Sequence, residues 1–121
     1  MASRTRSDII RSCFAAFASK ERQVIEDLLC DDFRFTSPYD DRIDKAAYFE
    51  RCWPNSERIR EHVLERICED GDEAFVLYRC ITHEGNTFRN TEHFRFDGDR
   101  VREIDVYFGA SYRDGVFVRQ E

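Results

Sequence analysis

The sequence lacks several features that mark whole classes of protein. It contains no apolar run that approaches the roughly 20 residues of a membrane-spanning helix, and residues 1–8 lack the apolar core of a secretory signal peptide. The five cysteines lie far apart and form no Cys-x-x-Cys pair, which argues against zinc and dithiol redox chemistry. We therefore expect a cytoplasmic protein with free, buried thiols and no membrane partner.

Positive charge is also scarce. The chain has 19 Lys and Arg residues against 25 Asp and Glu residues, which gives a formal net charge of -6. Its arginines stand singly among acidic residues, whereas binding to phosphate groups needs clustered positive charge. We expect no nucleic-acid partner.

Motifs that hold metals or cofactors are missing as well. The sequence has no Gly-rich phosphate loop and no nucleophile elbow of the Gly-x-Ser-x-Gly kind. His62, His83 and His93 are too scattered to suggest a site with several histidine ligands. We expect surface histidines, no metal and no cofactor.

Aromatic residues, by contrast, are abundant. The 121 residues include 11 phenylalanines, and 41% of all residues are hydrophobic. A chain of this length is of single-domain size and can bury an independent core. We expect one domain over residues 1–121, in which residues 110–121 form a tail with at most a short strand at 116–118.

The first half of the chain favours helices. Apolar side chains recur at steps of three and four residues over 9–17 and again over 24–29, which predicts two helices with one buried face each. A third helix is predicted from about Asp44 to Cys52, and Pro54 ends it.

The second half favours strands joined by turns. Strands are predicted at 33–37, 63–68, 74–82, 87–96 and 101–108, with turns at 69–72, 84–86 and 97–99. Residues 39–41, after Pro38, are predicted to form a loop. Helices on one side of an antiparallel sheet define an α+β fold. We expect a cone-shaped one, in which three N-terminal helices and a curved antiparallel sheet enclose an apolar pocket.

Several stretches carry a family resemblance. Residues 92–96 read Glu-His-Phe-Arg-Phe where steroid Δ5-isomerases read Asp-His-Phe-Arg-Phe, and residues 31–38 and 101–109 are similar to the first and last strands of that family. The chain thus resembles the nuclear-transport-factor-2-like superfamily, in its polyketide-cyclase-like and steroid-isomerase-like branches. Residues 37–41 and 51–54 resemble small uncharacterised bacterial members still more closely. The resemblance implies the cone-shaped fold and a homodimer, but this fold hosts many functions.

Strand alternation outlines the pocket. If Phe94 faces inward, Asn90 and Glu92 do so too, while His93 and Arg95 face outward. The family alignment adds further lining residues, namely Phe33, Phe35, Ser37, Tyr78, Cys80, Thr82, Ile104, Val106 and Phe108. Trp53 is expected either to cap the pocket mouth or to pack in the core. Alternation places Asp105 on the outer face.

Glu92 is the leading candidate for chemistry. A carboxyl group in an apolar pocket is costly to ionise, so its pKa should rise and it can donate a hydrogen bond while neutral. Resemblance aligns Glu92 with the neutral Asp of the steroid-isomerase oxyanion hole. The alternative is a structural carboxylate held by Arg66, Arg79, Arg89 or a buried water.

The other groups of the isomerase site differ here. The family places its general base directly before the proline that ends the first strand and a donor tyrosine on the first helix; these positions are Ser37 and Cys13. Steroid isomerisation by the known route is therefore not expected. Asp40 is the candidate for a substitute base, with a turn cap as its alternative role.

We interpret the chain as a pocket protein for a small, largely apolar organic molecule. One version of this interpretation is an isomerase- or cyclase-type enzyme that uses general acid–base chemistry. Glu92 would then be the acid, Tyr78 a second donor and Asp40 the base. The alternative is a non-catalytic ligand-binding or dimerisation module, which the residues at Ser37 and Cys13 favour.

Overall fold

The computed structural model describes residues 5–119. Four helical segments are present: α1 (Arg6–Ser19), α2 (Arg22–Leu28), α3 (Lys45–Arg51) and the 3-10 helix η1 (Trp53–Arg58). Seven strands follow or separate them: β1 (Leu29–Ser37), β2 (Asp40–Asp44), β3 (Ile59–Asp70), β4 (Glu73–Thr82), β5 (Thr87–Asp97), β6 (Arg100–Arg113) and β7 (Val116–Val118). No helix within residues 5–119 is long and apolar enough to cross a membrane.

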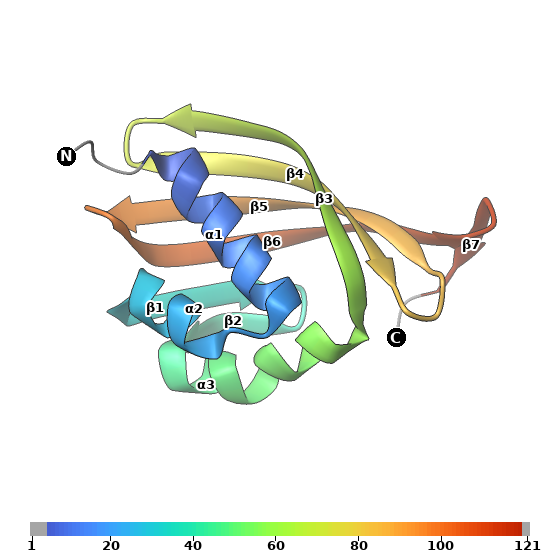
Figure 1. The fold of residues 1–121 in the computed structure, drawn as a ribbon, viewed down its shortest axis with the longest axis horizontal. Helices are drawn as coiled ribbons and strands as arrows, with labels where there is room; N and C mark the ends of the chain where they lie inside the picture. Colours follow the sequence, from blue (N-terminus) through green and yellow to red (C-terminus); the bar gives the residue numbers. More distant parts are fainter. Residues whose placement is uncertain (1–4, 120–121) are drawn as a thin grey trace.

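The strands form one curved, open sheet in the order β2-β1-β6-β5-β4-β3, with β7 added to β6. The helices cover one face of it, and α1 lies across the middle of the sheet (Figure 1). The expected α+β fold is therefore confirmed, with one correction to the antiparallel sheet. β1 pairs in parallel with β6, while every other strand pair is antiparallel.

Local sequence explains where α1 begins and which face it buries. Thr5 and Asp8 form a reciprocal capping box: the Thr5 hydroxyl accepts from the Asp8 amide at 3.0 Å, and the Asp8 carboxylate accepts from the Thr5 amide at 3.2 Å. Such a box satisfies amide groups that the first helical turn leaves without partners. The predicted apolar stripe is buried against the sheet, beginning with Ile9 and Ile10.

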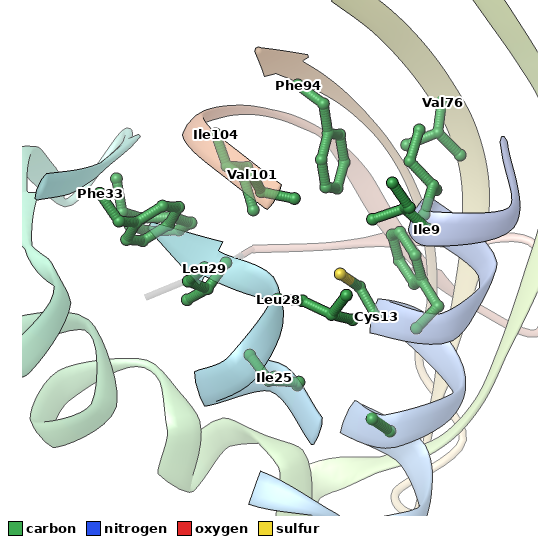
Figure 2. Close-up of a cluster of buried hydrophobic side chains, with 14 of the residues drawn as sticks. Ile9, Cys13, Ile25, Leu28, Leu29, Phe33, Val76, Phe94, Val101 and Ile104 are labelled. Carbon is green, nitrogen blue, oxygen red and sulfur yellow. The ribbon is translucent and has the colours of Figure 1, made fainter. Parts of the chain in front are cut away.

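The core lies between α1, α2 and the helix-facing side of the sheet (Figure 2). Its largest fully buried side chains include Phe33, Phe94, Leu29 and Val76, which come from three strands. Burying a side chain of this size stabilises the fold by about 1.5–3 kcal/mol. Phe33 belongs to this core, and its ring packs edge to face on Tyr48 at 5.4 Å.

Two segments differ from the predictions made for them. Residues 40–44 form strand β2, not the end of a loop, because Ile43 pairs with Phe35 and packs against the core. Residues 110–113 complete β6, and β7 returns along them as a hairpin, so they are not a tail. The short strand predicted at 116–118 is confirmed, and residues 120–121 lie outside the described part of the chain.

A β-bulge at Gly109 changes which side chains of β6 face inward. Asn90 pairs with Phe108 and Phe88 with Ser111, so residues 109 and 110 both oppose Arg89. A Cβ atom on Gly109 would lie 2.0 Å from the carbonyl oxygen of Arg89. Only glycine fits this close approach between the two backbones.

We predict that Gly109→Ala lowers the free energy of unfolding by roughly 2–4 kcal/mol, because the clash involves a backbone atom that cannot rotate away. Gly98→Ala is the matched control. Gly98 has a φ of +61° and open space around it, so we expect a loss of only about 1 kcal/mol there. Urea denaturation measures both, and equal losses would contradict the proposed close approach.

Candidate functional site

A cavity of about 670 Å³ lies between the helices and the inner face of the sheet. Side chains from all four helical segments and from each of the strands β1 to β7 line it. Exposed charged side chains also line it, among them Arg58 and Glu84, so the cavity opens to solvent on that side. A concave, largely apolar space with few polar groups is the usual form of a small-molecule site.

Most of the predicted pocket residues border this cavity. The structure places Glu92, Tyr78 and Asp40 in its wall, together with Phe35, Ser37, Cys80, Thr82, Asn90, Phe94, Ile104, Val106 and Phe108. Two of the predicted pocket residues, Phe33 and Trp53, do not border the cavity. Phe33 is 0% exposed and is sealed from the cavity inside the core. Trp53 packs beside the cavity, with its ring 5.6 Å from Phe17 and 6.1 Å from Phe49.

The polar groups of the cavity floor form a chain of hydrogen bonds. The Tyr78 hydroxyl donates to Glu92 Oε2 at 2.5 Å and accepts from Asn90 Nδ2 at 3.1 Å. Asn90 Oδ1 in turn accepts from the amide of Gly109 at 3.2 Å. The single hydrogen of Tyr78 is thus committed to Glu92, which makes Tyr78 a group that positions Glu92.

Burial raises the pKa of Glu92 to about 7, and the hydrogen bond from Tyr78 opposes that rise. Its carboxyl is surrounded by protein yet keeps part of its surface open to the cavity. Among the ion pairs of residues 5–119, none reaches Glu92; Arg89 instead pairs with Glu65 at 2.7 Å. Glu92 is therefore not the arginine-paired structural carboxylate considered as its alternative role.

Asp40 is more firmly held than Glu92. Its Oδ1 lies 2.7 Å from Arg51 Nη2, and its Oδ2 accepts from Ser37 Oγ at 3.2 Å. The side chain is only 8% exposed. The turn after Pro38 is capped by Ser37, whose hydroxyl accepts from the Tyr39 amide at 3.1 Å. The carboxylate of Asp40 is thus at the cavity wall but bound to a positive charge, which makes it a weak candidate for a base.

The cysteines of the cavity are not activated. Burial raises the pKa of Cys80 to about 12, and burial together with the charge of Asp40 raises that of Cys52 to about 12. The thiolate is the nucleophilic form, so both thiols are inert at neutral pH. All five cysteines are free, as expected, but Cys52 is only partly buried and Cys68 is exposed.

His62 is the titratable residue in the buried part of the cavity wall whose position the sequence analysis did not predict. Expected on the surface, it lies in the cavity wall, its ring 5.1 Å from Phe14 and 5.6 Å from Tyr78. Burial lowers its pKa to about 4. His62 pairs with Cys80 across β3 and β4, so a strand predicted to start before Val63 would have placed it on the inner face.

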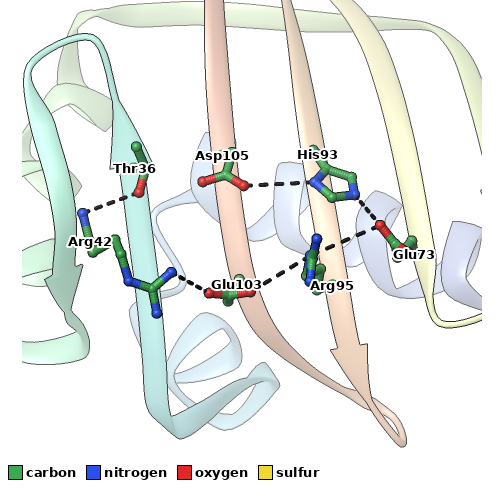
Figure 3. Close-up of polar contacts among 7 residues, drawn as sticks. All are labelled: Thr36, Arg42, Glu73, His93, Arg95, Glu103 and Asp105. Atoms are coloured by element: carbon green, nitrogen blue, oxygen red, sulfur yellow. Dashed lines mark hydrogen bonds and ion pairs between the residues drawn. The ribbon is translucent and has the colours of Figure 1, made fainter.

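The outer face of the sheet carries a separate polar network (Figure 3). His93 lies 2.7 Å from Glu73 and 3.7 Å from Asp105, and Arg95 lies between Glu73 and Glu103. The outward directions predicted for His93, Arg95 and Asp105 are therefore confirmed. His93 is nevertheless largely covered, because Phe75 stacks on its ring at 4.5 Å.

Comparison with known proteins agrees with this architecture. The sequence profile of the SnoaL-like domain family matches residues 10–104. The chain belongs to the SnoaL-like domain family. Its superfamily, the nuclear-transport-factor-2-like proteins, is the one that the sequence motifs resemble. No curated protein matches the sequence.

Solved structures show the same fold at low sequence identity. A nuclear-transport-factor-2-like protein of unknown function from Cytophaga hutchinsonii aligns with a TM-score of 0.72 and 18% identity, over 89% of this chain and 94% of that one. A putative SnoaL-like polyketide cyclase from Jannaschia has a TM-score of 0.72 and 15% identity, over 89% and 91%. The putative hydroxylase AclR from Streptomyces galilaeus has a TM-score of 0.74 and 14% identity, over 86% and 78%. Relatives of this fold therefore differ in the activities assigned to them.

The shifted pKa values of Glu92 and His62 predict opposite effects of pH on stability. Glu92 ionises near 4.5 when unfolded but near 7 when folded, so stability is lost as pH rises through this range, by up to about 3 kcal/mol. His62 is protonated below 6.5 when unfolded but only below about 4 when folded, so its neutral burial destabilises the fold as pH falls from 6.5 to 4.

Glu92→Gln should therefore gain stability relative to the wild type as pH rises from 5 to 8, by up to about 3 kcal/mol. His62→Phe should gain relative to the wild type as pH falls from 7 to 4.5. Urea denaturation across this pH range measures both differences. Differences that do not change with pH would show that the two groups titrate normally.

Proposed function

We propose that this chain binds a small, largely apolar organic molecule in the cavity. The observation that carries the proposal is Glu92, a carboxyl without a nearby positive charge, fixed by Tyr78 in an otherwise mainly apolar wall. A protein gains no stability from such a group, because its burial without a cation is unfavourable. Retaining it is consistent with a role toward a ligand.

The chemistry that fits this arrangement is general acid–base catalysis of the isomerase or cyclase type. A pKa near 7 keeps a large fraction of Glu92 protonated at neutral pH, so it can donate a hydrogen bond or a proton to a carbonyl oxygen of the ligand. Tyr78 and Asn90 hold the carboxyl in place. The name of the Jannaschia relative, a putative polyketide cyclase, agrees with this class of reaction.

A second candidate function is ligand binding without turnover. Ser37 stands where the family places its general base, and its hydroxyl is engaged by Asp40 and the Tyr39 amide. Asp40 itself is bound to Arg51. With Asp40 held by a cation in this way, the inner cavity supports recognition of a ligand more readily than proton abstraction by Asp40.

The proposed cavity function is tested by a thermal-shift screen with steroids, terpenoids, aromatic polyketide fragments and fatty acids. A ligand present at 100 times its Kd stabilises the folded state by about 2.7 kcal/mol, which raises Tm by several degrees in a chain of this size. We expect at least one class to stabilise the wild type and to stabilise Glu92→Gln less.

Glu73→Gln is the matched control for that screen, because Glu73 lies on the outer face. It should retain the wild-type response to every compound. No response from any compound, together with a lower stability of Glu92→Gln at all pH values, would contradict the proposal.

We also propose that two copies associate through the outer face of the sheet. Leu77, Thr91 and Tyr107 lie side by side there on β4, β5 and β6, and both Leu77 and Tyr107 are exposed. Phe75 adds a further exposed ring. Strand register places His93 and Asp105 two residues along from Thr91 and Tyr107, within the polar network of the same face (Figure 3). A two-fold related copy can therefore match opposite charges beside the apolar strip.

Sedimentation at micromolar concentration tests this association. The wild type should have twice the chain mass of 14.5 kDa, and Leu77→Glu should be monomeric, because it places a charge in the centre of an apolar contact. Val24→Glu is the control, since Val24 is an exposed side chain on α2. A monomeric wild type would contradict the proposed dimer.

A further inference from the structure

His62 stands in the cavity without a function in the chemistry described above. It lies on β3, directly opposite Cys80 of β4, and its ring contacts those of Phe14, Phe17 and Tyr78. These contacts fix the plane of the imidazole in an aromatic surround. A side chain held in this way is positioned as firmly as Glu92.

The nitrogen atoms of His62 have no partner within the protein. Nδ1 is fully buried, whereas Nε2 is not, and no hydrogen bond found among residues 5–119 involves either ring nitrogen. Because His62 lines the cavity, Nε2 is the nitrogen that a bound molecule can reach. A neutral imidazole has one N–H donor and one lone pair that accepts. Polar groups in protein interiors nearly always have hydrogen-bond partners, so an Nε2 that has none in the protein is available to a molecule in the cavity.

The neighbouring polar groups cannot supply that partner. The hydrogen of Tyr78 is donated to Glu92, and the Thr82 hydroxyl donates to the carbonyl oxygen of Asn86 at 3.5 Å. The lowered pKa of His62 keeps its ring uncharged at neutral pH, which leaves the lone pair free to accept. The cavity therefore presents a donor at Glu92 and an acceptor at His62, on either side of Tyr78.

We propose that His62 accepts a hydrogen bond from a hydroxyl group of the ligand, whose apolar body lies in the cavity. The inference rests on the proposed binding function and specifies its ligand: an uncharged aromatic or alicyclic molecule that carries a hydroxyl group. A carbonyl group on the same molecule would meet Glu92. His62 is then the residue that selects hydroxylated ligands over their hydrocarbon analogues.

The test compares 2-naphthol with 2-methylnaphthalene, which replaces the hydroxyl by a methyl group of similar size. Their Kd values are measured from amide chemical shifts of the cavity residues in the wild type and in His62→Phe, which keeps a ring but loses the acceptor. One neutral hydrogen bond corresponds to roughly a three- to tenfold preference. We expect that preference for 2-naphthol in the wild type and its loss in His62→Phe.

Two further variants make the result specific. His62→Gln retains an acceptor and should recover part of the preference, whereas His83→Phe replaces an exposed histidine and should leave it unchanged. Equal affinities of the wild type for both compounds, or a preference that persists in His62→Phe, would overturn the role proposed for His62. Either result would leave the proposed binding function of the cavity intact. Failure of both compounds to bind in the wild-type cavity would overturn the binding function as well.

Discussion

The burial of Glu92 without a positive charge is the constraint on which the rest of the site depends. Ionisation there is opposed by loss of water, and only the hydrogen bond from Tyr78 works in the other direction. Tyr78 is held by Asn90, and Asn90 by the amide of Gly109. The bulge at Gly109 brings that amide to Asn90. A continuous chain of hydrogen bonds thus links the bulge in β6 to the carboxyl group of Glu92.

Much of the fold could be predicted because its signals are local. The apolar stripes over 9–17 and 24–29 predicted α1 and α2, and the turns of the second half predicted the long strands, although β3 begins earlier and β6 ends later than expected. The pairing of β1 with β6 could not be predicted in this way, because it joins residues about 70 positions apart, such as Phe35 and Ile104. Strand β2 was also missed, since the preceding Pro38 and the aspartates at 40 and 41 favour a turn.

The cavity residues could be predicted where the strands alternate regularly. They could not be predicted where tertiary packing determines which side chains reach the cavity. Alternation around Phe94 placed Glu92 and Asn90 correctly in the cavity wall. It could not show that Phe33 lies in the core while Phe35 borders the cavity, because both are phenylalanines at inward positions of β1. His62 was missed because the predicted strand began at residue 63, whereas β3 begins at Ile59. The ion pair of Asp40 with Arg51 depends on how α3 meets β2, which no local pattern encodes.

The protonation of Glu92 is the most direct test of this account. Nuclear magnetic resonance of the side-chain carboxyl carbon, with Glu92→Gln to assign the signal, follows its ionisation in the folded protein. The account predicts a midpoint near pH 7, well above the ordinary value for a glutamate. A midpoint near 4.5 would show that water or a positive charge stabilises the carboxylate. The uncharged donor on which the proposed function rests would then be absent.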